Sequence, residues 1–151
     1  MKIIKETLKY FTSTLFILLF ASSNATSDGH ILGEKVGDFT AKMTPAEVFK
    51  GGNKVNLHTK DFGDYGEMFW TATFHSDGSF TEEGMSFQEG GKVSTFSSTG
   101  TWSTVQKNGQ DTHRWKVAVI VTNSDGEKFV AESTYDLATM TNKGSVYTLA
   151  K

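Results

Sequence analysis

The feature that most constrains this chain is a two-residue alternation of apolar and polar side chains. In residues 68–75, Met68, Trp70, Ala72 and Phe74 fall on one face and the residues between them on the other. A strand places successive side chains on opposite faces, so this period predicts strands with one buried face. The same alternation recurs in residues 93–104, 114–122 and 128–137.

Short turn signals separate the alternating runs. Asp-Gly and Asn-Gly pairs tolerate the positive φ angles that tight hairpins require. The predicted turns are Ser76-Asp77-Gly78, Glu89-Gly90-Gly91, Asn108-Gly109, Ser124-Asp125-Gly126 and Asn142-Lys143-Gly144. Further strands are expected at 31–41, 53–59 and 145–150. The sequence therefore predicts an all-β fold, an antiparallel meander of about eight strands that closes into a small barrel and so removes its edges.

One short helix is expected near residues 44–50. Thr44-Pro45-Ala46-Glu47 has the pattern of a capping box with proline at the first helical position. Gly51 and Gly52 follow, and a glycine in the left-handed conformation commonly ends a helix.

The first 25 residues have the pattern of a signal peptide. Lys2, Lys5 and Lys9 form a positive segment, and an apolar run over 15–21 follows it. This run is shorter than the roughly 20 residues that a membrane-spanning helix needs. Cleavage near Ala25 would leave residues 26–151 as a single barrel domain. The prediction is a secreted or periplasmic protein with no stable membrane insertion after cleavage.

The composition excludes several kinds of site. The chain has no cysteine, and its net charge of -2 is unfavourable for binding nucleic acid. Its four histidines do not stand at metal-ligand spacings. We therefore expect no metal, no cofactor and no nucleic-acid partner, and the sequence does not predict the oligomeric state.

The predicted inward face is rich in large aromatic side chains, with small residues between them. Its aromatic members are Trp70, Phe74, Phe96, Trp102, Trp115, Phe129, Tyr135 and Tyr147. A barrel of about eight strands is either filled by its side chains or holds one small ligand. For the second case, the candidate ligand-binding residues are Trp70, Phe74, Trp102, Trp115 and Tyr135. His75, Arg114 and Glu83 are candidate polar groups near the rim.

Two alternatives to ligand binding stay open. One is a filled structural barrel that acts through protein contacts, with the hydroxyl row from Thr95 to Ser103 as the contact face. The other, which we favour less, is a small enzyme. Glu82 and Glu83 are neighbours on a strand, so one of them should point inward. An inward Glu83 or His75 would then act as acid or base, although no catalytic residue is assigned. An outward-apolar membrane barrel is disfavoured, because the sequence shows no consistent aromatic girdles.

Two motifs resemble those of small bacterial lipocalin-like proteins. They are Phe74-His-Ser-Asp77-Gly78-Ser-Phe80 and Ser98-Thr-Gly100-Thr-Trp102. The segment from Thr44 to Val55 resembles the entry to the barrel in such proteins, so the resemblance covers about residues 44–105. It implies a calycin-type barrel that binds a small apolar or amphipathic ligand. The Gly-x-Trp motif lies mid-chain here, whereas lipocalins carry it on their first strand.

Overall fold

The structure is a computed structural model, and it describes residues 32–150. The predicted signal peptide and its cleavage site lie outside these residues. Within residues 32–150, eight strands follow one another. They are β1 (Leu32–Phe49), β2 (Gly52–Thr59), β3 (Glu67–His75), β4 (Ser79–Phe87), β5 (Val93–Lys107), β6 (Gln110–Asn123), β7 (Lys128–Asp136) and β8 (Thr141–Leu149).

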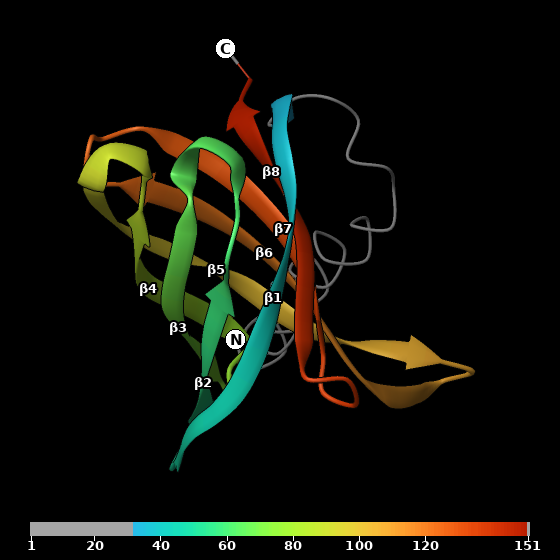
Figure 1. The fold of residues 1–151 in the computed structure, drawn as a ribbon. Helices are drawn as coiled ribbons and strands as arrows, with labels where there is room; N and C mark the ends of the chain where they lie inside the picture. The colour runs from blue at the N-terminus through green and yellow to red at the C-terminus, as the bar shows by residue number, and fades with distance from the viewer. Residues whose placement is uncertain (1–31, 151) are drawn as a thin grey trace, which may run out of the picture. The chain divides into compact units, whose positions relative to one another are not determined.

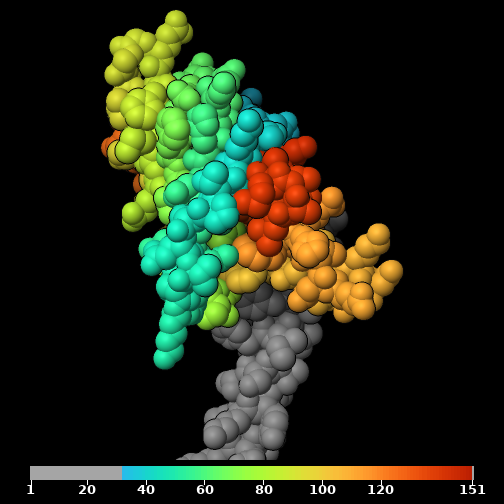
Figure 2. Space-filling model, turned by 60° about the horizontal axis from the view of Figure 1, so that its bottom comes forward, coloured from blue at the N-terminus to red at the C-terminus, as the bar shows by residue number. Residues whose placement is uncertain are grey.

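The strands form a closed antiparallel barrel in chain order, which confirms the predicted fold class (Figure 1). Each strand pairs with the next, and β1 pairs with β8 to close the sheet. The ends of β5 and β6 extend beyond the barrel as a hairpin (Figure 1 and Figure 2). This extension begins at an irregularity between Thr104 and Gln106, where the pairing register shifts. Within residues 32–150, no helix is long and apolar enough to cross a membrane.

The predicted helix near residues 44–50 is wrong, because this segment continues strand β1 to Phe49. Thr44 and Pro45 pair with β2, and a bulge between Pro45 and Glu47 accommodates the extra residue. The pairing of β1 with β8 already ends at Lys42. Pro45 therefore lies where one side of β1 has no neighbouring strand, and its missing N–H interrupts no ladder. The capping pattern favours a helix locally, but pairing of this segment with β2 determines its conformation.

Most of the predicted turns are present. Asn108 and Gly109 both have positive φ, 54° and 74°, as a tight hairpin between β5 and β6 requires. The turn predicted at Asn142-Lys143-Gly144 is wrong, because these residues lie inside β8. The connection before β8 is residues 137–140, where Met140 has a φ of 51°. Gly144 instead leaves space in the sheet for the ring of Phe39.

The apolar face of the sheet turns inward, and the hydroxyl row on β5 lies outside. Thr95, Ser97, Thr99, Thr101 and Ser103 are all exposed. Tyr147 was expected inside, but it pairs with Val130, whose strand neighbours Phe129 and Ala131 line the interior. Tyr147 therefore points outward, since paired residues share a face.

Candidate ligand-binding site

One end of the barrel is filled by five aromatic side chains, which we call the aromatic plug. They are Phe74, Phe80, Trp102, Trp115 and Tyr135. Phe74 is at the centre, with ring centroids 4.8 Å from Phe80, 4.7 Å from Trp115 and 4.9 Å from Tyr135. Four of the five predicted ligand-binding residues thus pack against one another instead of bordering empty space.

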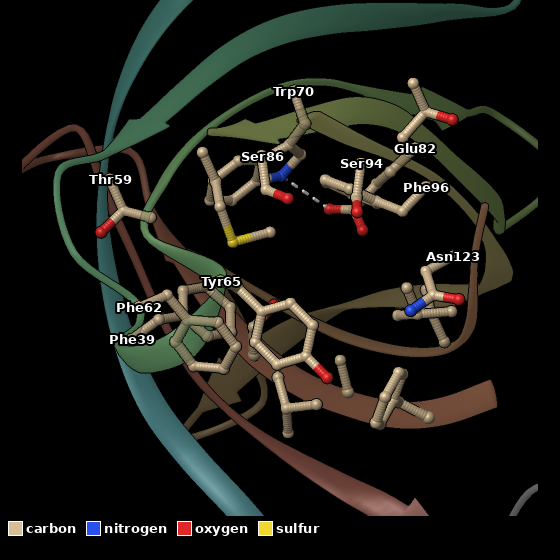
Figure 3. A pocket seen from close by; sticks show the side chains of 18 residues that line it. Phe39, Thr59, Phe62, Tyr65, Trp70, Glu82, Ser86, Ser94, Phe96 and Asn123 are labelled. Carbon is tan, nitrogen blue, oxygen red and sulfur yellow. Dashed lines mark hydrogen bonds between the residues drawn. The ribbon is translucent and has the colours of Figure 1, made fainter. Parts of the chain in front are cut away.

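The other part of the barrel encloses a cavity of about 90 Å³ that opens to solvent on one side (Figure 3). Trp70 is the only one of the five predicted ligand-binding residues that lines it. The volume is smaller than an apolar cavity of about 150 Å³ that admits benzene. A guest must therefore be small or narrow, or it must extend out of the barrel.

Six aromatic rings follow one another along the cavity wall, and we call them the aromatic belt. They are Phe129, Tyr65, Phe62, Phe39, Trp70 and Phe96. Successive centroids lie 5.8–6.4 Å apart, mostly edge to face. Met68, Val119, Val121 and Val146 complete the apolar wall. The belt offers ring faces and edges to a guest, which is a common composition for small-molecule sites.

The connection between β2 and β3, residues 60–66, supplies two rings of the belt. It contains a single 3-10 turn, η2 (Gly63–Tyr65). Phe62 and Tyr65 line the cavity, while the acidic residues Asp61 and Asp64 are exposed. Asp61 Oδ1 accepts a hydrogen bond of 3.0 Å from the Gly63 amide, which fixes the turn. The connection therefore places two aromatic rings in the cavity wall and its carboxylates in solvent.

A carboxyl group lies inside the barrel, between the plug and the belt. Glu82 lines the cavity, and its Oε1 accepts a hydrogen bond of 3.1 Å from Trp70 Nε1 (Figure 3). The same oxygen accepts a bond of 2.6 Å from the Tyr135 hydroxyl. Its Oε2 accepts a bond of 2.7 Å from Ser98 Oγ. Glu82 thus joins one ring of the belt to one ring of the plug.

Burial shifts the pKa of this carboxyl group. Loss of solvent raises the pKa of Glu82 above its ordinary value, although the hydrogen bonds from Tyr135, Ser98 and Trp70 act in the opposite direction. Burial also raises the pKa of Tyr135 well above its ordinary value, and the neighbouring Glu82 adds to this effect. Tyr135 consequently remains a neutral hydrogen-bond donor at physiological pH.

The three predicted rim groups lie away from the cavity. The inward glutamate is Glu82, so the hypothesis of an inward Glu83 is wrong; Glu83 is exposed on the outer face. Arg114 is exposed and its Nε donates a 2.9 Å hydrogen bond to Asp136. His75 ends β3, and its carbonyl oxygen accepts a 2.8 Å bond from Trp102 Nε1 of the plug. The structure therefore does not bring these groups together.

Sequence reasoning missed the two loop aromatics and could not choose the inward glutamate. A signal for the loop exists, because two aromatic residues interrupt an otherwise polar connection. Within residues 32–150, no cluster of three metal-ligating side chains occurs. Comparisons with protein-family models, with curated proteins and with solved structures find nothing that matches this chain.

Proposed function

We propose that the protein is a secreted or periplasmic, lipocalin-like binding protein for a small apolar or amphipathic molecule. The observation that carries this proposal is the apolar cavity inside a closed barrel, open on one side and filled only at the other end. Barrels with this arrangement are suited to hold one small ligand. The resemblance of residues 44–105 to lipocalin-like proteins supports the same function.

The volume of the cavity limits the size of the ligand. About 90 Å³ is well below the roughly 300–1,000 Å³ typical of sites for larger ligands. A short unbranched chain or one small ring fits this space best. A longer guest would extend along Phe62 and Tyr65 into solvent.

A cavity-filling substitution with a matched control tests the proposal. Ala131 lines the cavity, whereas Ala118 is exposed on the outer face of the neighbouring strand. We expect 1-hexanol to bind to the wild-type protein and to Ala118→Leu, measured by calorimetry, and to lose at least tenfold in affinity for Ala131→Leu. Equal affinities for all three proteins would show that hexanol does not enter the cavity.

Native mass spectrometry on protein purified from its natural source gives a second test. An additional mass that is released on denaturation would identify the class of the guest. A bare polypeptide mass, together with no detectable hexanol binding, would contradict the proposal.

A surface feature favours a second candidate, a barrel that acts through protein contacts. Phe69, Met85, Phe87 and Val93 are large apolar side chains that are 42–54% exposed. They lie on adjacent strands, since Phe69 pairs with Met85 and Phe87 with Val93. Contiguous exposed apolar side chains commonly mark interaction surfaces. Replacing Phe69 and Phe87 by serine would abolish such contacts while leaving hexanol binding unchanged.

A further inference from the structure

We infer that the ligand is a small amine, an apolar chain or ring that carries one cationic nitrogen, and that this nitrogen binds the Glu82 carboxylate. The inference rests on the proposed function, because it requires that a guest enters the cavity. It adds the chemical class of that guest.

The first support is the unused acceptor capacity of Glu82. An ionised carboxylate has about four acceptor positions. Three are taken, two on Oε1 by Trp70 and Tyr135 and one on Oε2 by Ser98. The indole N–H of Trp70 can only donate, so Glu82 Oε1 must act as an acceptor. One acceptor position remains on Oε2 of a residue that lines the cavity.

The second support is that the described residues around the cavity offer no counter-charge. The 18 residues of the segment 32–150 that line it include no lysine, arginine or histidine, and Glu82 and Tyr65 are their only ionisable side chains. A buried carboxylate without a cationic partner is unfavourable, and burial accordingly raises the pKa of Glu82. A guest cation would supply the missing charge and stabilise the ionised form.

The third support is the aromatic belt itself. Trp70 donates to Glu82, and its ring lies 6.0 Å from Phe39 and 6.4 Å from Phe96. A cation held at Glu82 would therefore lie among aromatic rings. Ring faces attract cations, and the attraction is stronger at a site that excludes water.

The fourth support is the charge at the open end. The connections on this side of the barrel are residues 60–66, 88–92 and 124–127, and they carry five acidic and two basic side chains. The connections at the plug end, 50–51, 76–78, 108–109 and 137–140, carry one acidic and one basic side chain. An excess of carboxylates around an entrance raises the local concentration of cations and repels anions.

These observations distinguish three guests of equal length. Hexylamine pairs its cation with Glu82, 1-hexanol fills the same space without a charge, and hexanoate places a second negative charge beside a buried carboxyl group. We expect affinity to fall in that order. A charge-assisted hydrogen bond favours the amine over the alcohol by at least tenfold, or about 1.4 kcal/mol.

Calorimetry on the intact protein with these three compounds tests the inference. Glu82→Gln keeps an acceptor for Trp70 and Tyr135 but removes the charge. Glu83→Gln is the matched control, because it removes the same charge from the outer face of the same strand. We expect the amine preference to disappear in Glu82→Gln, with hexanol affinity retained, and to persist in Glu83→Gln. Retained hexanol binding also shows that the variant is folded.

Three results would overturn the inference. They are equal affinities of wild-type protein for hexylamine and hexanol, tighter binding of hexanoate, and an amine preference that survives in Glu82→Gln. In each case the proposed binding function still holds, because hexanol or hexanoate occupies the cavity. If none of the three compounds binds, both the inference and the proposed function are wrong.

Discussion

Asn142 is the basis of a prediction about stability, because its side-chain amide is buried without a partner. The residue is 1% exposed, and neither Nδ2 nor Oδ1 has a hydrogen-bond partner in the described part of the chain. Its neighbours across the sheet are Ala41 and Tyr135, both fully buried. Each unsatisfied buried polar group costs about 1–3 kcal/mol.

Asn142→Leu should therefore stabilise the protein. Leucine has the same branching and the same number of heavy atoms as asparagine, but its two terminal methyl groups need no partners. Its larger methyl groups add some crowding, and overpacking costs about 1–3 kcal/mol. Since the amide has two unsatisfied groups, we expect a net rise of about 1–3 kcal/mol in the free energy of unfolding.

Urea denaturation monitored by tryptophan fluorescence measures this change. The midpoint should rise at an unchanged slope, because the surface exposed on unfolding is nearly the same. Asn56→Leu is the control, since Asn56 is exposed and its Oδ1 accepts a 2.8 Å bond from Thr71. That variant should be neutral or slightly less stable. A loss of more than about 1 kcal/mol in Asn142→Leu would refute the reasoning and indicate that the amide is satisfied.

Three other predictions concern packing in the plug, the protonation of Glu82 and the close approach of two strands at Gly100. Trp102→Ala should lower the free energy of unfolding by about 3 kcal/mol but change the Kd for hexanol less than twofold; a larger change in Kd would place the guest in the plug. Because burial raises the folded-state pKa of Glu82, the folded chain retains a proton that the unfolded chain releases as pH rises above 4.5. The free energy of unfolding of the unliganded protein should therefore fall as pH rises from 4.5 to the raised pKa of the folded state, by at most about 1.4 kcal/mol per pH unit. The same dependence of this free energy on pH in Glu82→Gln as in the wild-type protein would contradict the prediction. Gly100→Ala should cost about 1–3 kcal/mol, because its Cβ would collide with the Ala118 carbonyl oxygen; an unchanged melting temperature would show that the strands can separate.

The fold was predictable because the alternation and the turn residues give consistent local signals. The two-residue alternation correctly predicts that the side chains of Trp70, Trp102 and Trp115 lie on the inner face. The period does not give the height of a residue along the barrel axis, which depends on pairing register. Trp70 pairs with Gly84 and lines the cavity, whereas Trp102 pairs with Val117 and joins the plug. The sequence alone therefore could not separate binding residues from packing residues.

The inward glutamate was not predictable because β4 carries two conflicting patterns. Phe80 and Ser86 mark the inner face, but Met85 and Phe87 place apolar side chains on the outer face. Glu82 shares a face with Phe80 and Ser86, and Glu83 shares a face with Met85 and Phe87, so the local pattern does not show which glutamate points inward. Only the pairing of β4 with β3 and β5 fixes the phase, and that pairing joins residues that local patterns do not connect.

The pairing of β1 with β8 has a consequence for how the chain folds. It joins the two ends of the barrel, and the Glu34 amide donates to Thr148 Oγ1 across 114 positions in the sequence. Contacts between such distant residues raise the contact order and slow folding. Until β8 is in place, the unpaired edges of β1 and β7 can pair with other chains. Pairing of Thr141–Leu149 with both strands covers these two edges at once and removes them as templates for aggregation.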